Sequence, residues 1–222
     1  MQAQLSQRND PDDVAVQLRA GIATGRFVPN ERLIEADLAT TLNTNRANVR
    51  IALAMLDQEG LVVRERNRGA RVRRVSDDEA MEIAEARRAL EGVVARQAAA
   101  RASKADTVRL RGIIAAMRKA FAASDFIEVS QLNGELHAEI QRIAGNGTVT
   151  RLLQTLKSQV VRQQYRAILL PGRAKASVQE HAAIVGAICA HDAAAAEAAM
   201  LGHMDSVIAA LKQAIALHAG GV

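Results

Sequence analysis

The sequence predicts a mainly α-helical protein with one short β-hairpin, and three observations support this. Apolar residues make up 49% of the 222 residues, yet aromatic residues make up only 2%. A core of Ala, Leu, Ile and Val suits closely packed helices. Apolar residues recur at helical spacing over most of the chain, whereas residues 61–75 alternate apolar and basic side chains, as a strand does. At this length, one large or two modest domains are expected.

The first 75 residues predict three helices and a hairpin. Acidic residues 12–13 precede VAVQLRAGIATG, whose apolar residues keep helical spacing up to a stop at Gly25. FVPNERL is expected to form a turn, EADLATTL (35–42) a short helix, and RANVRIALAMLDQEG a third helix that ends at Gly60. LVVRERNRGARVRRV then alternates around a turn at Asn67–Gly69, as a hairpin does.

Two helices joined by a tight turn and followed by a basic hairpin describe a winged helix-turn-helix, which we assign to residues 1–75. The chain has a net charge of +5. Six arginines and one acid lie between Leu61 and Val75. The planar guanidinium suits phosphates and guanine edges. A solvated arginine-rich face explains the same charge equally well, so charge alone leaves both interpretations open.

Nearly the whole first domain follows a more specific pattern, LRAGIATGRFVPNERLIEADLATTLNTNRANVRIALAMLDQEGLVVRERNRGARV. Its strongest pieces are the spaced ERL-E--LA--L, the R--VR-AL--L---GLV of the third helix, and the hairpin glycine. The pattern resembles the DNA-binding domain of the GntR family of bacterial transcription regulators. Asn30 replaces the usual glycine, and NRANVRIAL stands where a Ser-Arg-Thr-Pro-Val-Arg-Glu-Ala-Leu type segment is common. These departures fall mostly on groove-facing positions, so they concern the operator sequence more than the fold.

The resemblance implies that the third helix enters the major groove of double-stranded DNA. Arg46 and Arg50 lie four residues apart and share a face, so either could contact guanine, while Asn48 could contact adenine or phosphate. Asn45 is the expected N-cap of this helix. Exposed helix arginines usually just face solvent, but here helix spacing, basic wing and family resemblance agree. The expected DNA-binding residues are Asn45, Arg46, Asn48, Arg50, Arg68, Gly69 and Arg71.

Residues 76–222 predict a second, all-helical domain. A long amphipathic helix starts with SDDEAMEIAEARRALEG, and no strand pattern or repeat follows. The further helices are expected near residues 104–123, 126–144, 148–169, 175–190 and 192–217. They should form an antiparallel bundle of about six helices, in which side chains on facing helices build any cofactor site.

Three histidines of this domain fall on inward faces of three helices. In QLNGELHAEIQRIAGN, Asn133 and His137 lie one turn apart on the shoulder of an apolar stripe. His181 and His203 lie on apolar stripes of two later helices. A single buried histidine is usually a hydrogen-bonded core residue, whereas three that converge suggest a metal held by imidazoles and an oxygen ligand. Helical periodicity does not show whether they converge, so both interpretations stay open.

The stretches EARRALEGVVARQAA, LNGELHAEIQRIAGN and EHAAIVGAICAHDAAAAEAAMLGHM carry a second resemblance. They are similar to the FCD domain, the all-helical ligand-binding domain of FadR-type GntR regulators. The resemblance implies a divalent metal (Zn, Ni or Mn) bound by Asn133, His137, His181 and His203. Asn133 stands where many members have Asp, which removes one negative charge. His191 and His218 match no ligand position.

The FCD resemblance also assigns a role to Arg87, which matches an arginine that points into the bundle cavity. A guanidinium beside a metal would bind a small carboxylate effector. The alternative for Arg87 is a structural ion pair with a bundle acid such as Glu91, and both interpretations stay open.

The two resemblances together imply a homodimeric, DNA-binding transcription regulator rather than an enzyme. One alternative is a metal-dependent enzyme, although Glu135 and Glu139 fall off the His137 face and leave no obvious general base. The other is a DNA-binding protein whose bundle serves only dimerisation. The sequence contains no apolar run long enough to span a membrane and no leader-like segment, and Cys189 is its single cysteine. We therefore expect a cytoplasmic protein without membrane contact.

Overall fold

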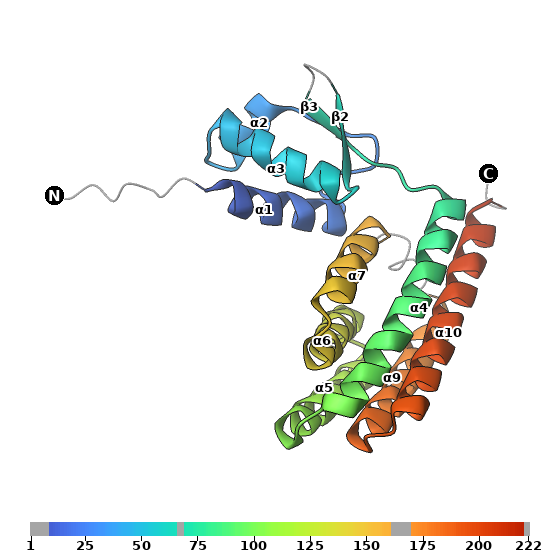
Figure 1. Ribbon diagram of the computed structural model, residues 1–222. Helices are drawn as coiled ribbons and strands as arrows, with labels where there is room; N and C mark the ends of the chain where they lie inside the picture. Colours follow the sequence, from blue (N-terminus) through green and yellow to red (C-terminus); the bar gives the residue numbers. More distant parts are fainter. Residues whose placement is uncertain (1–8, 66–68, 161–169, 220–222) are drawn as a thin grey trace. The chain divides into compact units, whose positions relative to one another are not determined.

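The computed structural model describes residues 9–65, 69–160 and 170–219 (Figure 1). The fold is mainly helical, as predicted, and the chain divides into two compact units. The first comprises residues 1–76 with 157–162, and the second comprises 77–156 with 163–222. Each unit has an apolar core of its own.

The first unit contains the three predicted helices, which are α1 (Pro11–Thr24), α2 (Glu35–Thr41) and α3 (Arg46–Gln58). Asp10 caps α1, because its side chain accepts a hydrogen bond from the backbone N–H of Asp13 at 2.9 Å. The apolar faces of the helices meet in one core, whose fully buried large side chains are Leu18, Leu33, Leu53 and Leu56.

A three-stranded antiparallel sheet completes this unit, with β1 (Arg32–Leu33), β2 (Val62–Glu65) and β3 (Gly69–Val72) in the order β1-β3-β2. Strands β2 and β3 are the two sides of the predicted hairpin, while the segment between them lies outside the described residues. Strand β1 falls in the segment expected to be a turn. Two residues are too short to show the alternation of a strand, so β1 exists only through its pairing with β3.

The second unit is a bundle of long helices. Those described are α4 (Asp77–Arg101), α5 (Lys104–Ala122), α6 (Phe126–Ala144), α7 (Gly147–Gln159), α9 (Arg173–Cys189) and α10 (Ala193–Ala219), and the end of α7 from residue 157 on is assigned to the first unit. They agree with the predicted bundle. Of the helix predicted over 148–169, the structure describes α7, and 161–169 lie outside the described residues.

Helix α10 packs along both α4 and α9, and α5 lies between α6 and α9. A small residue permits close approach of α4 and α10, because a Cβ added to Gly92 of α4 would lie 3.0 Å from Leu201 of α10. Fully buried side chains from four of these helices, including Met117, Leu136, Ile184 and Met200, fill the centre. Among the described residues, no helix is long and apolar enough to cross a membrane.

Candidate metal centre and nucleic-acid interface

Three buried histidines from three helices meet inside the bundle. They are His137 on α6, His181 on α9 and His203 on α10, each at most 5% exposed. One ring nitrogen of each lies within 4.8 Å of the others, and the Nε2 atoms of His137 and His181 are 3.3 Å apart. Two imidazoles on one metal, each with a bond of about 2.0–2.1 Å, place their nitrogens roughly 3.0–3.4 Å apart. The spacing of this histidine cluster therefore fits a shared metal ion.

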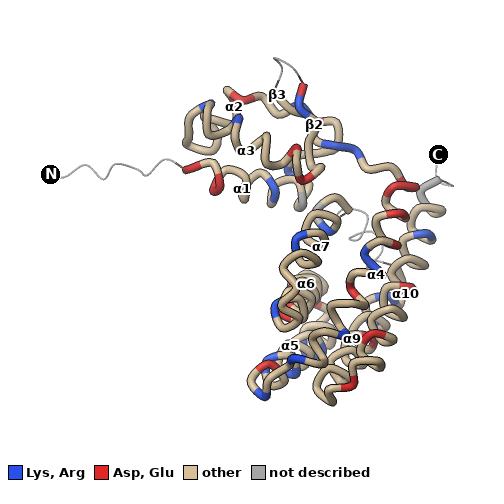
Figure 2. The backbone as a smooth tube through the Cα atoms, in the orientation of Figure 1, with Lys and Arg blue, Asp and Glu red and all other residues tan. Residues whose placement is uncertain are grey.

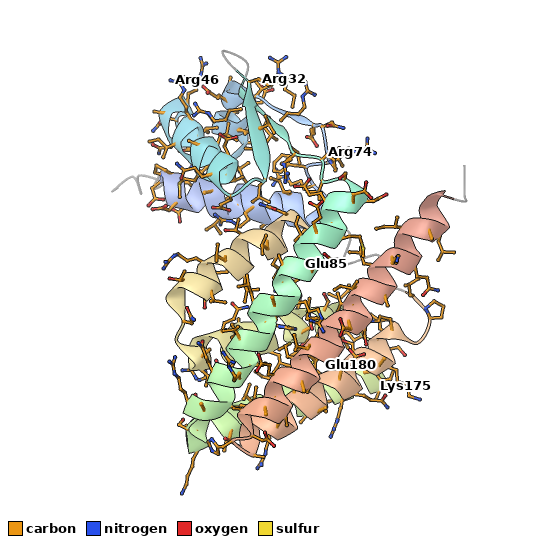
Figure 3. All side chains as sticks on the ribbon, turned by 45° about the vertical axis from the view of Figure 1, so that its right-hand side comes forward. Arg32, Arg46, Arg74, Glu85, Lys175 and Glu180 are labelled. Carbon is orange, nitrogen blue, oxygen red and sulfur yellow. The ribbon has the colours of Figure 1, made fainter. Side chains whose placement is uncertain are left out.

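On each ring, the Nδ1 atom contacts a hydrogen-bonding side chain. The three contacts are His137 with Glu91 at 3.2 Å, His181 with Ser177 at 3.3 Å, and His203 with Glu180 at 2.7 Å. Figure 3 labels Glu180, which reaches from α9 to the histidine on α10. A carboxylate that accepts the Nδ1 proton leaves the Nε2 lone pair unprotonated, which is the usual outer support of a metal-binding histidine.

Burial keeps two of these imidazoles neutral. Burial first, then the charges of neighbouring histidines, lowers the pKa of His181 well below its ordinary value. Burial likewise lowers the pKa of His203, against the hydrogen bond from Glu180. Burial disfavours the Glu91 carboxylate, but the charges and hydrogen bonds of His137 and Arg87 prevail and lower the pKa of Glu91. Neutral imidazoles at His181 and His203 and an ionised carboxylate at Glu91 suit a divalent cation.

Asn133 and Arg87 are the residues expected to supply an oxygen ligand and an anion contact. Asn133 is half-buried one turn before His137, and its amide has no hydrogen-bond partner among the described residues. Arg87 is 5% exposed, and its Nη2 lies 3.4 Å from Glu91, which is the structural ion pair considered above. Its buried Nε has no acceptor among the described residues. Leaving a buried donor unsatisfied is costly, so this group suits a ligand oxygen.

Sequence reasoning missed three residues of the centre, which are Ser177, Glu180 and Arg173, and it named Glu91 only as a partner of Arg87 and not of His137. Arg173 is buried and lies 3.0 Å from Glu180 in an ion pair without hydrogen-bond geometry. The sequence offered one signal for these contacts, which is the i,i+4 spacing of Arg87 with Glu91 and of Ser177 with His181. His191, which matched no ligand position, is exposed and contacts the carbonyl of Ala99. The side chain of His218 lies outside the described residues.

At the start of α3, the two asparagines serve the helix itself. Asn45 is the N-cap, as predicted, and its Oδ1 accepts from the backbone N–H of Asn48 at 2.9 Å. The Asn48 side chain donates to the carbonyl of Asn9 at 3.0 Å and to Thr44 Oγ1 at 3.1 Å. Because both amide hydrogens are used internally, Asn48 has only its oxygen left for DNA.

Arg46 and Arg50 are exposed together on α3 beside one acid. Their side chains are 67% and 57% exposed, and both contact Glu35 of α2. Arg50 makes a two-fold contact at 3.2 and 2.9 Å, whereas Arg46 lies 3.8 Å away. Arg46 and Arg32 both project outward in Figure 3. A base contact by Arg50 therefore requires exchange of Glu35 for DNA.

The wing presents basic residues on β2, β3 and the segment that follows (Figure 2). Arg71 donates to Glu65 at 2.9 Å and to the carbonyl of Asn30 at 2.6 Å. Gly69 has φ +83°, and a Cβ there would lie 2.4 Å from the carbonyl oxygen of Leu33. Glycine is thus required by the sheet at this position. Arg68 lies outside the described residues.

Comparison with known protein families and relatives agrees with this architecture. Residues 11–72 match the family of bacterial regulatory proteins called gntR, and residues 82–206 match the FCD domain. A putative L-lactate dehydrogenase operon regulatory protein from Escherichia coli is 28% identical, over 91% of this chain and 86% of that protein. A probable D-xylose utilization operon transcriptional repressor from Paenarthrobacter nicotinovorans is 29% identical, over 90% of this chain and 86% of that protein.

Solved structures show the same fold. The Escherichia coli protein McbR/YncC superposes with a TM-score of 0.80 at 20% identity, over 91% of this chain and 97% of that one. A putative GntR regulator from Rhodococcus sp. RHA1 gives a TM-score of 0.71 at 21% identity, with the same coverage. The family that residues 11–72 match consists of regulatory proteins, which favours a regulator over the enzymatic alternative. The chain belongs to the GntR family of bacterial transcription regulators, in the group whose second domain is an FCD domain.

Proposed function

We propose that this regulator binds an operator as a homodimer and that a small carboxylate, bound at a metal in the FCD domain, changes its affinity for DNA. The observation that carries the proposal is the arrangement of the three histidines. Their Nδ1 atoms are occupied by Glu91, Ser177 and Glu180, and one nitrogen of each ring lies close to the other two. Core histidines that only fill space need no common centre.

In the proposed site, His137, His181 and His203 hold a divalent metal, with the Asn133 amide oxygen as a fourth ligand. The ion is Zn, Ni or Mn, all of which accept imidazole and oxygen ligands. When bound, the metal supplies a Lewis-acidic position for a ligand oxygen. Arg87 contributes the second contact, because its buried Nε needs an acceptor and its charge favours a carboxylate.

The relatives support a small polar effector. One is named for an L-lactate dehydrogenase operon and another for D-xylose utilization. A short 2-hydroxy acid combines a carboxylate for Arg87 with a hydroxyl for the metal, so this class is the first to test.

For DNA, we propose that Arg46 and Arg50 of α3 contact bases and that Arg71 of the wing contacts phosphate. Two copies are needed because one short recognition helix makes too few base contacts, and two-fold operators are bound by two-fold proteins.

The test is a titration of a DNA fragment selected by the protein from a random pool. In metal-loaded protein, one of a panel of short 2-hydroxy acids and dicarboxylates, L-lactate included, should change operator affinity roughly 5- to 150-fold. Arg87→Gln should bind DNA normally and lose this response. The proposal of a carboxylate effector fails if the whole panel leaves affinity unchanged, or if Arg87→Gln responds like the wild type.

A further inference from the structure

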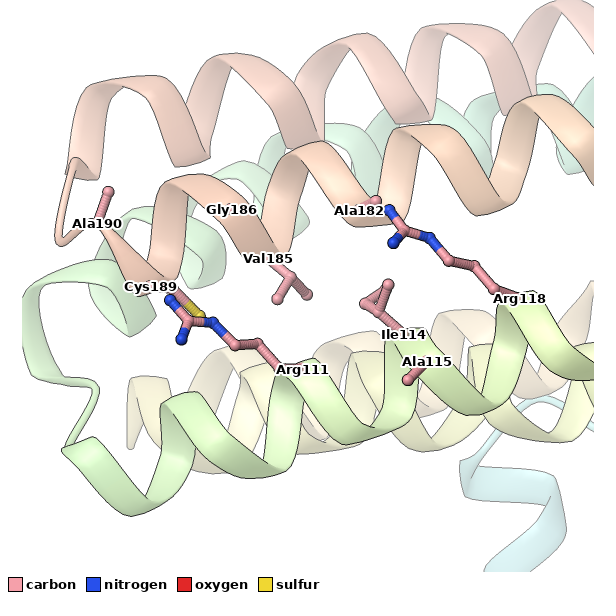
Figure 4. A pocket seen from close by; sticks show the side chains of 9 residues that line it. All are labelled: Arg111, Ile114, Ala115, Arg118, Ala182, Val185, Gly186, Cys189 and Ala190. Atoms are coloured by element: carbon pink, nitrogen blue, oxygen red, sulfur yellow. The ribbon is translucent and has the colours of Figure 1, made fainter.

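The second unit has an open groove between α5 and α9. It has a volume of about 400 Å³ and is lined by residues of these two helices and by Ala190, the C-cap of α9. Ile114 and Val185 form an apolar floor, and Arg111 and Arg118 reach from α5 towards α9 (Figure 4). The remaining lining is almost entirely alanine and glycine.

The two groove arginines are exposed and unpaired. Neither Arg111 nor Arg118 has an ion-pair partner within the described parts of the chain. They lie seven residues apart, which is about 10 Å along a helix. On the neighbouring helix α6, Glu128 and Glu135 are also seven residues apart and exposed, and their carboxylates likewise have no partner among the described residues.

The register of α5 against α6 is fixed by ion pairs between them. Asp106 pairs with Arg142, and Arg109 lies 3.6 Å from Glu139. Both pairs belong to one antiparallel register, in which each step forward on α5 matches one step back on α6.

This register brings the free acids to the same axial levels as the free arginines. Along the common helix direction, Glu128 of α6 lies level with the α5 residue two positions after Arg118. Glu135 likewise lies level with the α5 residue two positions after Arg111. Each offset is roughly 3 Å along the helix axis. The charges do not meet within one chain because α5 lies between α6 and α9, and the arginines line the groove on the α9 side.

We propose that the face formed by α9, α5 and α6 binds a second copy of this chain, with α6 of each copy over the α5–α9 groove of the other. The two-fold axis of this dimer lies in the shared face and runs parallel to the helices. A half turn about this axis brings α6 of the second copy to the α9 side of α5 in the first copy, and it leaves every residue at its axial level. Arg111 then meets Glu135 of the second copy, and Arg118 meets Glu128. Two-fold symmetry repeats both pairs.

The uncharged residues of this face support close approach of two copies. Added Cβ atoms at Gly112 of α5 and Gly186 of α9 would meet nothing within 4 Å, so packing within the chain does not require glycine there. Ala115 lies between the two arginines and is exposed. Val108, on the same side of α5, is 72% exposed and would gain cover in the dimer.

The proposal deepens the homodimer of the proposed function and is tested by charge reversal in the full chain. One variant carries Arg111→Glu with Arg118→Glu, and the other carries Glu128→Arg with Glu135→Arg. Each alone places like charges against each other, so dimerisation should weaken at least tenfold in sedimentation velocity. An equimolar mixture should form heterodimers, because the reversed charges of one variant complement those of the other. All four substitutions in one chain should also restore the dimer.

Arg151→Glu with Lys212→Glu is the control for the first variant, since it makes the same change of net charge at exposed positions on α7 and α10. It should dimerise like the wild type. If the wild type dimerises and both reversed variants still do, this surface is wrong while the proposed homodimer stands. The surface is also wrong if the reversed variants stay monomeric in the mixture and in the fourfold variant. A monomeric wild type would overturn the proposed homodimer and this surface together.

Discussion

At the scale of single residues, the proposed base contact of Arg50 depends on the ion pair that Arg50 makes with Glu35. Its guanidinium contacts both oxygens of Glu35, and the hydrogen bond from Arg50 lowers the pKa of Glu35 although burial opposes that shift. The Arg50 side chain is 57% exposed, so solvent screening limits what this ion pair contributes to stability. Breaking the ion pair between Arg50 and Glu35, so that Arg50 can contact a guanine edge instead, therefore costs little free energy.

Arg50→Ala should weaken specific operator binding by roughly 1–3 kcal/mol if the side chain contacts guanine. Gel shifts on the selected operator and on a scrambled fragment measure this. Arg71→Ala is the matched comparison in the wing: it should weaken binding to both fragments alike and reduce the log–log salt slope by about one. Unchanged affinity and unchanged sequence preference in Arg50→Ala would show that α3 does not read bases through this residue.

Helical periodicity shows which residues point inward, but not which of them meet. The spacing of apolar residues was enough to place His137, His181 and His203 on buried faces, as the structure has them. It could not identify Glu91 or Glu180 as their partners. Those contacts depend on the rotation and axial shift of one helix against another, which local sequence does not encode.

At the scale of helices and strands, local capping signals explain why the helix bounds were predictable. Ser103 and Asp106 form a capping box at the start of α5, where the Ser103 side chain accepts from the Asp106 backbone at 3.2 Å and the Asp106 carboxylate accepts from the Ser103 backbone at 2.8 Å. Strand β1 has no such local signal, because only pairing with β3 defines it.

Ser103→Ala should lower the stability of the second unit by about 1 kcal/mol through loss of this cap. Hydrogen bonds from Ser103 first, then from Arg142, lower the Asp106 pKa to about 2. The pKa of this carboxyl is lower in the folded state than its value of about 3.9 in the unfolded chain. The ionised carboxylate therefore stabilises the fold above about pH 3.9, and this contribution is lost as pH falls towards 2. Urea unfolding of Asp106→Asn should thus differ most from wild type above about pH 5 and converge with it at lower pH.

Ser130→Ala, at an exposed position within α6, is the control for the cap and should stay within about 0.5 kcal/mol of wild type. A difference between Asp106→Asn and wild type that persists undiminished at low pH would contradict the role given to the ionised carboxylate.

At the scale of the whole molecule, the proposed metal would join helices α6, α9 and α10, which are separate in sequence. It binds the native state and hardly the unfolded chain, so its binding free energy adds to the stability of the bundle. The same helices α6 and α9 border the proposed dimer face, so a change at the metal has a short route to the interface between copies. The fold class was predictable because capping, periodicity and family pattern agree, whereas the meeting of three helices at one point emerges only in three dimensions.

The metal content of protein purified without a histidine tag is the most direct test of the central claim. We predict one divalent metal per chain by elemental analysis, its loss in His181→Ala, and normal content in the His191→Ala control. Chelation of the wild type should lower its melting temperature, and the metal should restore it. Wild-type protein that contains no metal, takes none up and melts identically with and without chelator would contradict the claim and leave the three histidines as core residues.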